Sequence, residues 1–183
     1  IKLMKLKLRI FLFSINFMLS TLAFSQTFVT SVAGTGVDGN VLDGELAVNG
    51  AIGYCDDVFT NQNGDVYFSD ILNSSLRKID AQTGVISSIA IGSGFTVTSF
   101  VVEDNGDIIF INYGQNIVKH DVLTGTNSVL VSNVSFGTTS NNFGMCKRGD
   151  SIFVAGGNSH KIFLYEYVSG TWSESVYAGT GIA

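Results

Sequence analysis

One sequence pattern recurs three times along this chain of 183 residues, and it limits the possible folds more than any other feature. Each copy is a Gly-Asp turn followed by a short segment that contains an aromatic residue and reads as a β-strand. The copies are Asn63–Asp70, Asn105–Asn112 and Arg148–Ala155, and their glycines lie 42 and 43 residues apart. Such a period indicates one supersecondary unit that is copied along the chain and packs against its neighbours.

Three further strand patterns accompany each Gly-Asp strand. The first precedes the turn, at Tyr54–Thr60, Val97–Glu103 and Asn141–Lys147. The second follows the strand, at Leu76–Asp80, Ile117–Asp121 and Ile162–Tyr167, and the last lies at Val85–Ala90, Asn127–Val131 and Trp172–Tyr177. Alternating polarity, β-branched and aromatic residues and Gly, Asn and Asp turns favour antiparallel sheet. We therefore predict an all-β chain of about three four-stranded antiparallel blades of a β-propeller.

The two ends of the chain favour a propeller over the alternatives, a β-sandwich or a β-helix. A sandwich predicts no such repeat, and β-helix repeats are much shorter. The sequence Val32–Gly36 recurs as Tyr177–Gly181, where it closes the last strand of the third unit. By the same phase, Phe28–Gly34 is expected to form an outermost, ring-closing strand within residues 26–36. Residues 37–183 would then be an incomplete set of blades, a fragment of the whole ring.

The N-terminus has the features of an export signal. Four basic residues precede an apolar run from Ile10 to Phe24, and Ala23-Phe24-Ser25 places small residues where a signal peptidase cleaves. We predict that residues 1–25 are a signal peptide and that the mature chain is secreted, periplasmic or at the cell surface. A transmembrane anchor is the alternative, although polar residues interrupt the run and it is shorter than the ~20 residues that span a bilayer.

Charge argues against nucleic acid as a partner. Residues 1–25 contain four of the ten basic residues and none of the 15 acidic ones, which leaves the mature chain with a net charge of −9. Nucleic-acid binding normally requires clustered Lys and Arg. We expect a protein or carbohydrate ligand, no nucleic acid and no membrane span in the mature chain.

The cysteines and histidines are not spaced like metal ligands. Cys55 and Cys146 fall at different positions of the repeat, in the first and third units, so we expect both to remain unpaired as small buried residues. His120 and His160 are expected in or beside the second hairpin of a blade, away from the channel.

Four stretches together resemble NHL-repeat β-propellers. They are Val32-Ala-Gly-Thr-Gly36, the acidic and glycine-rich Asp38–Glu45, Asn63–Asp70 and Leu76–Asp80. Asp38–Glu45 belongs to an insertion, Val37–Gly53, that lengthens the first unit. The resemblance is good in residues 28–94 and looser in the second and third units. It implies a six-bladed, propeller-like protein of the secreted bacterial type, although this chain lacks the proline common in NHL units.

The candidate ligand site lies where the innermost strands begin, because these strands surround the central channel of a propeller. The aligned positions, each eight residues before the glycine of its unit, are Asp56, Thr98 and Asn141. Lactonases of similar architecture hold Ca²⁺ there through oxygen ligands, so the resemblance makes Asp56 and Asn141 candidate Ca²⁺ ligands. The alternative is that these residues only cap turns. We expect no other cofactor.

Two functions remain open at this point. The sequence contains no nucleophile elbow, no His-Glu-x-x-His and no phosphate-binding glycine loop, so we expect no catalytic residues. A secreted binding scaffold for a protein or glycan is therefore the leading hypothesis. A Ca²⁺-dependent lactonase or lyase with its metal in the central channel is the alternative.

The open arc of blades gives a first testable prediction. Residues 26–183 expressed alone are expected to be oligomeric or aggregated, because two blade flanks and the N-terminal strand would lack partners. Light scattering measures this directly, and a monomer that melts cooperatively would contradict it.

Overall fold

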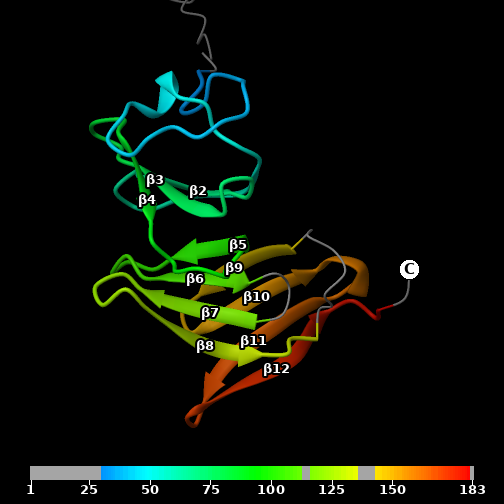
Figure 1. Cartoon of the computed structure of the whole chain (residues 1–183). Coiled ribbons are helices and arrows are strands. Elements are labelled where there is room, and N and C mark those ends of the chain that lie inside the picture. Colours follow the sequence, from blue (N-terminus) through cyan, green and yellow to red (C-terminus); the bar gives the residue numbers. More distant parts are fainter. Residues whose placement is uncertain (1–29, 113–115, 136–142, 182–183) are drawn as a thin grey trace, which may run out of the picture. The chain divides into compact units, whose positions relative to one another are not determined.

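The computed structural model describes residues 30–112, 116–135 and 143–181, and these form three four-stranded antiparallel sheets (Figure 1). The predicted all-β fold with three four-stranded units is therefore confirmed. Residues 1–25 lie outside the described part, so the signal peptide stays a prediction. Within the described part, no helix has the length and apolar character that a membrane crossing would need.

Each sheet contains four consecutive strands in sequence order, and we call the sheets blades 1, 2 and 3. Blade 1 contains β1 (Cys55–Thr60), β2 (Val66–Asp70), β3 (Ser75–Ile79) and β4 (Ile86–Ile89). Blade 2 contains β5 (Val97–Val102), β6 (Ile108–Asn112), β7 (Asn116–Asp121) and β8 (Thr126–Ser132). Blade 3 contains β9 (Phe143–Arg148), β10 (Ser151–Gly156), β11 (Ile162–Val168) and β12 (Thr171–Ala178). Two short 3-10 turns, η1 (Ala47–Asn49) and η2 (Gly157–Ser159), complete the described elements.

The core lies between neighbouring blades. Alternate side chains of each strand face opposite sides of the sheet, so one blade contributes to two interfaces. Blades 1 and 2 enclose Tyr67, Leu76, Phe100, Phe110 and Val118, among others. Blades 2 and 3 enclose Ile109, Ile111, Ile117, Ile152, Val154, Phe163 and Tyr165. Three strand aromatics, Tyr67, Phe110 and Phe163, therefore pack between blades.

Two other aromatic residues take different places. Phe68 faces the opposite side of blade 1, where it packs with Val41 and Ala47 of the insertion. Phe153 contacts the ring of Tyr177 within blade 3, with ring centroids 5.0 Å apart.

The blades are tied together where their innermost strands begin. The Asp57 carboxylate accepts hydrogen bonds from the Ser99 hydroxyl at 2.7 Å and from the backbone N–H of Phe100 at 3.0 Å. At the next interface the Ser99 hydroxyl accepts the backbone N–H of Met145 at 3.0 Å. A side chain of one blade therefore holds the backbone of the next blade at both interfaces.

A strand irregularity turns these side chains toward the neighbouring blade. The pairing of β1 with β2 shifts between Cys55 and Val58, and that of β5 with β6 shifts between Val97 and Ser99. Such β-bulges redirect side chains out of the regular alternation. Asp57 and Ser99 lie within or at the end of these bulges, which explains how they reach the adjacent blade.

The third Gly-Asp turn differs structurally from the first two. In blade 3 the ladder continues to Arg148 and Ser151, so that Gly149 and Asp150 form a tight two-residue connection. In blade 1 the last pair is Thr60 with Val66, and the longer connection contains Asp65. Accordingly Asp65 is buried, whereas Asp150 is exposed. The Gly-Asp dipeptide therefore occupies a different place relative to the strand ladder in blade 3 than in blade 1.

The expected N-terminal strand is not formed in its described part. Of Phe28–Gly34, only residues 30–34 are described, and they are not assigned to a strand. The backbone N–H of Gly34 instead donates to the carbonyl of Ala47 in the insertion, at 2.9 Å. Ring closure by residues 26–36 stays a prediction.

The hydrogen bonds between blades give a prediction about stability. Asp57→Ala removes the acceptor for Ser99 and Phe100, so we expect a loss of about 2–3 kcal/mol in the free energy of unfolding. Asp56→Ala is the matched control, because Asp56 is exposed and its removal is expected to change stability by about 0.5 kcal/mol or less. Urea denaturation measures both, and equal effects would contradict the assignment.

Candidate functional site

The sequence-predicted site residues do not form a common cluster in the described structure. Asp56 is exposed, and its pKa is raised by partial burial and then by the charge of Asp57. Thr98 is only 3% exposed, and its hydroxyl donates to the carbonyl of Ile111 within its own blade. Asn141 lies outside the described residues. The residues that meet between blades are instead the next ones in sequence, Asp57 after Asp56 and Ser99 after Thr98.

The inter-blade hydrogen bonds also show which residue of blade 3 corresponds to Thr98 of blade 2. Phe100 and Met145 are the equivalent donors of blades 2 and 3, and Thr98 lies two residues before Phe100. The corresponding residue of β9 is therefore Phe143, which lies two residues after Asn141. The short turn of blade 3 produces this displacement.

No group of three His, Cys, Asp or Glu side chains converges as a metal site within the described ranges. In the insertion, the Asp43 carboxylate contacts Arg77 and accepts a hydrogen bond from Ser88. Cys55 and Cys146 are free and exposed, so the expectation that they are buried is wrong. The histidine expectation fits better, because His120 is buried in β7 and contacts Asn127 at 2.8 Å.

The far ends of the innermost strands carry most of the organised charge. Asp65 pairs with Lys78 at 2.7 Å and accepts the backbone N–H of Ala81. The hydrogen bond from Lys78 is the main reason that the pKa of Asp65 lies below its usual value. The carboxylate therefore fixes the Gly-Asp turn of blade 1 to the next hairpin of the same blade.

Blade 2 repeats this arrangement and extends it. Asp107 pairs with Lys119 at 2.9 Å and accepts the backbone N–H of Val122. Lys119 also pairs with Glu103 at 2.7 Å, and the other oxygen of Glu103 pairs with Lys147 of blade 3 at 2.9 Å. Glu103 thus links two lysines and joins blades 2 and 3.

The protonation of this cluster follows from its contacts. Burial acts to raise the pKa of Glu103, but the hydrogen bonds from Lys119 and Lys147 outweigh burial and the pKa is lowered. The pKa of Asp107 is likewise lowered, against the effect of burial, by Lys119 and Asn105. The pKa of Lys119 is raised by Glu103 and Asp107. The cluster is therefore fully ionised near neutral pH.

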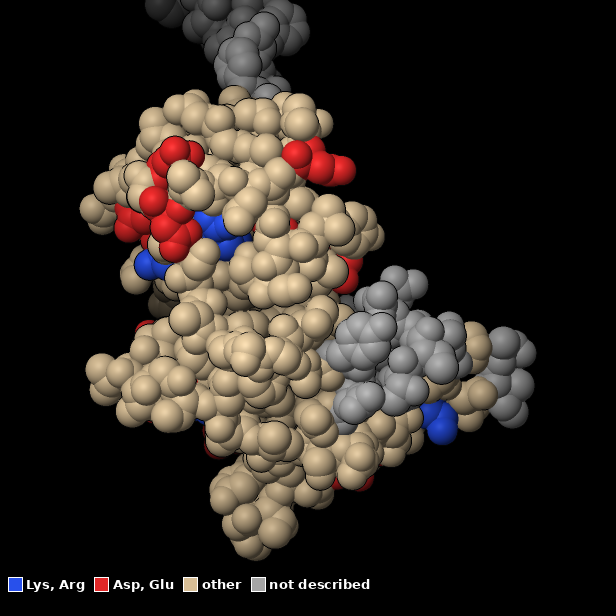
Figure 2. Space-filling view, viewed as in Figure 1, with Lys and Arg blue, Asp and Glu red and all other residues tan. Residues whose placement is uncertain are grey.

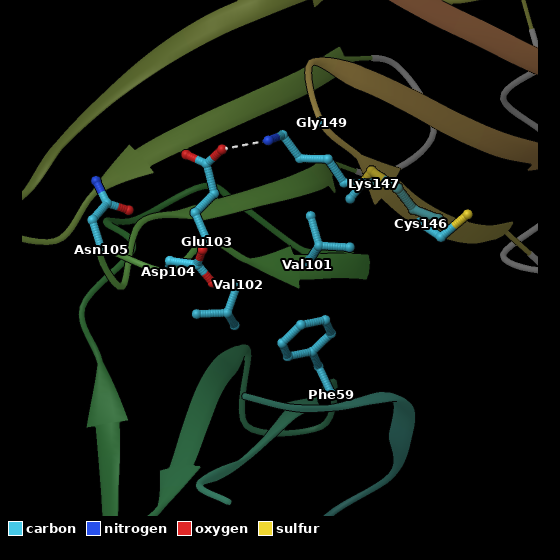
Figure 3. Close-up of a pocket in the computed structure, with 10 residues that line it drawn as sticks. Phe59, Val101, Val102, Glu103, Asp104, Asn105, Cys146, Lys147 and Gly149 are labelled. Atoms are coloured by element: carbon cyan, nitrogen blue, oxygen red, sulfur yellow. Dashed lines mark ion pairs between the residues drawn. The ribbon is translucent and has the colours of Figure 1, made fainter. Parts of the chain in front are cut away.

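A cavity of about 680 Å³ lies beside these charges (Figure 3). Its apolar lining comes from Phe59, Val101, Val102 and Met145. Its polar lining comes from Glu103, Asp104, Asn105 and Lys147. In Figure 3, Glu103 and Lys147 reach toward each other on one side, and the ring of Phe59 lies on the opposite side. All three innermost strands or the turns after them contribute to this cavity.

A second recess of about 590 Å³ extends the cavity toward blade 1. It shares Phe59, Glu103 and Asp104 with the first and adds the turn of blade 1, including Gln62. The Gln62 amide donates to the exposed Asp104 carboxylate at 3.4 Å, which connects the turns of blades 1 and 2. We call the two recesses together the inter-blade cleft.

The charge on the molecular surface is unevenly distributed (Figure 2). On the face shown, acidic side chains gather over blade 1 and the insertion, around a small basic area. The part of this face formed by blades 2 and 3 is mostly neutral. On the face shown there is no broad basic surface of the kind that nucleic acid binding requires.

Comparisons with solved structures identify the architecture. An auxiliary nutrient binding protein from Bacteroides ovatus ATCC 8483 matches with a TM-score of 0.57 and 22% identity, over 70% of this chain and 33% of that one. A catalytically inactive virginiamycin B lyase from Staphylococcus aureus with quinupristin matches with a TM-score of 0.50 and 18% identity, over 76% of this chain and 46% of that one. YCF48 bound to a D1 peptide matches with a TM-score of 0.50 and 14% identity, over 68% and 41% of the respective chains.

These similarities show the fold alone. The sequence matches no family model and no curated protein. The chain spans about a third to a half of the length of the three solved structures. The described residues are three blades of a β-propeller, as the repeat predicted.

The inter-blade cleft was not predicted from the sequence. The candidate site predicted from the sequence lies at the starts of the innermost strands, whereas the cleft lies at their ends. One signal was available: Lys78 and Lys119 occupy the same strand of successive units, each opposite the aspartate of its Gly-Asp turn. The contribution of Lys147 could not be read in this way, because the third turn is shorter.

The ion pairs predict how stability depends on pH. The lowered pKa values of Glu103 and Asp107 mean that the unfolded chain binds protons more readily, so their contribution is present above the ordinary values of 4.5 and 3.8 and is lost as the pH falls below them. We expect Lys119→Met to be less stable than the unmodified protein at pH 7, with a smaller further loss between pH 6 and pH 3.

Lys161→Met serves as the control for this experiment, because none of the ion pairs above includes Lys161. Urea denaturation at a series of pH values gives the comparison. An unchanged pH dependence in Lys119→Met would show that the cluster contributes nothing to acid sensitivity.

Proposed function

We propose that this chain is a binding scaffold exported from the cytoplasm, and that the inter-blade cleft holds a carbohydrate ligand. The single observation that carries the proposal is the composition of the cleft, where the Phe59 ring and neighbouring aliphatic side chains lie opposite fixed polar groups. Binding sites typically combine apolar walls with a few positioned donors and acceptors. The Bacteroides nutrient-binding protein of similar fold is consistent with this role.

The ligand class follows from charge. The first recess is lined by two carboxylates, Glu103 and Asp104, and one ammonium, Lys147, in a chain whose net charge is −5. An anionic ligand would be repelled by this balance. A neutral ligand rich in hydroxyl groups can donate to Asp104 and accept from the remaining N–H groups of Lys147 while an apolar face covers Phe59. A glycan has these properties.

The polar groups of the cleft are suited to binding rather than to proton transfer. Glu103 is held by two lysines and has a lowered pKa, so it is a poor general acid or base near neutral pH. The lining of the described cleft includes neither of the histidines. The alternative of a Ca²⁺-dependent lactonase rests on Asp56 and Asn141, and no contact of the described residues favours it.

The proposal also includes export by a signal peptide and a relation to the NHL-repeat family. The signal features of residues 1–25 support a location outside the cytoplasm, in agreement with a carbohydrate-binding role. The Asn63–Asp70 and Leu76–Asp80 stretches support a relation to NHL-repeat propellers. Both statements rest on sequence patterns.

A binding experiment tests the proposal. The exported chain is screened against an array of neutral and acidic glycans, and calorimetry measures the affinity of the best neutral glycan. We expect Asp104→Ala to weaken that affinity about tenfold or more, because the loss of one charged hydrogen-bond acceptor costs about 1.5–3 kcal/mol. Asp104 is exposed, so folding should not be affected.

Asp150→Ala is the matched control, since Asp150 lies in the corresponding turn of blade 3 and does not line either recess. It is expected to bind like the unmodified chain. Binding of acidic glycans only, or equal binding by Asp104→Ala, would overturn the assignment. Binding of a protein but of no glycan would show that the ligand is a protein, which would also overturn the carbohydrate assignment.

A further inference from the structure

Arg77 is the largest fully buried side chain of the described protein, with 2% exposure. Its guanidinium donates to the side-chain oxygen of Asn40 at 2.8 Å, to the carbonyl of Val41 at 2.8 Å and to the Asp43 carboxylate at 3.1 Å. All three acceptors belong to the insertion. The remaining nitrogen, Nε, is buried without a hydrogen-bond partner. The charge of Arg77 is therefore neutralised and solvated by the insertion.

The position of Arg77 in the sheet makes this arrangement unusual. Arg77 pairs with Phe68 in blade 1, and the corresponding pair of blade 2 is Val118 with Phe110. In blade 3 it is Phe163 with Val154. Val118 and Phe163 are buried against the preceding blade. Blade 1 thus has a cation where the other blades have an apolar residue that packs on a sheet.

The insertion also pairs with the outer edge of blade 1. The backbone N–H groups of Gly44 and Ala47 donate to the carbonyls of Ile86 and Gly84, each at 2.9 Å. The N–H of Ile86 donates in turn to Glu45 at 2.9 Å. These bonds pair the insertion with Ile86, the first residue of β4, and with Gly84 in the turn before it, where the sheet edge would otherwise be open to another strand.

A few further contacts hold the insertion: the Asn73 amide donates to the carbonyl of Gly39 at 2.9 Å, and the Ser88 hydroxyl donates to Asp43 at 3.0 Å. Val41 and Ala47 are buried against Phe68, Ile79 and Ile86. The larger apolar side chains Leu42, Leu46 and Val48 are 67%, 45% and 47% exposed. Segments with few buried contacts open at lower free energy than the core. A buried guanidinium that loses its acceptors is strongly destabilising, so the buried position of Arg77 is stable only while the insertion is docked.

We propose that the insertion is a latched cover: it shields the first face and the outer edge of blade 1, and it opens as a separate unit when Arg77 loses its acceptors. In the docked state the cover occupies the face that blades 2 and 3 use for contact with a preceding blade. In the open state that face and the start of β4 are exposed. Arg77 is the latch.

Hydrogen exchange of backbone amides measured by NMR tests the cover on the full chain. In Arg77→Met we expect the Gly44, Ala47 and Ile86 amides to exchange about tenfold faster or more, because these N–H groups bond the cover to β4. The Phe100 and Met145 amides, which bond one blade to the next, are expected to exchange at unchanged rates.

Lys78→Met is the matched control, because Lys78 is the next residue of β3 and pairs with Asp65 on the opposite face of the sheet. It should leave the three cover amides protected. Asp43→Asn is the second variant, since Asp43 is 53% exposed and its change does not endanger folding. It should accelerate the same amides about threefold in the same direction.

The outcomes are distinct. Faster exchange confined to Gly44, Ala47 and Ile86 supports a separate latched cover. Equal acceleration of the Phe100 and Met145 amides would show that the insertion unfolds only with the blades, which overturns the proposal. Unchanged cover amides in Arg77→Met would overturn the role of Arg77, and if that variant does not fold, Asp43→Asn decides.

Discussion

Successive blades of this protein are joined by a hydrogen bond in which a side chain on one innermost strand accepts a backbone N–H from the next. Asp57 receives Phe100, and Ser99 receives Met145. The bulges that aim these side chains lie at the start of the strands, so the spacing of the blades is fixed at that end. The apolar side chains of the sheets then fill the volume that this spacing leaves between them.

Charges organise the opposite end of the same strands. The lysines of β3 and β7 each neutralise the aspartate of their own turn, and Glu103 carries the pattern across to blade 3 through Lys147. These groups are held by one another, so the side chains lining the cleft are fixed in place, as the proposed binding of a ligand would need. The apolar wall that includes Phe59 completes a cleft of mixed character.

The sequence predicted the strands and the blades well, because an alternating apolar pattern and a regular repeat are properties of local residues. It predicted the site poorly for a specific reason. Gly149-Asp150 has the same letters as Gly64-Asp65, yet it forms a tighter turn, so the alignment by glycines points to Asn141 where the ladder points to Phe143. Turn length depends on pairing between strands, which residue identity did not reveal.

Neighbours in sequence also exchanged their roles. Asp56 was expected at the channel, but the bulge directs Asp57 to the next blade and leaves Asp56 exposed. Arg77 was read as part of a family-like strand, and its burial depends on three acceptors from a segment 34–37 residues earlier in the chain. Contacts of that kind arise only when the whole blade is assembled.

The short turn of blade 3 shows what the separation of the two ends allows. In blade 3 the aspartate of the turn is exposed, unlike the buried aspartates of blades 1 and 2, yet the innermost strand is still held by Ser99. The length of a turn thus differs between blades while the inter-blade hydrogen bond is present in each. The turns are therefore the part of each blade that can differ, while the opposite ends of the strands keep neighbouring blades at a fixed spacing.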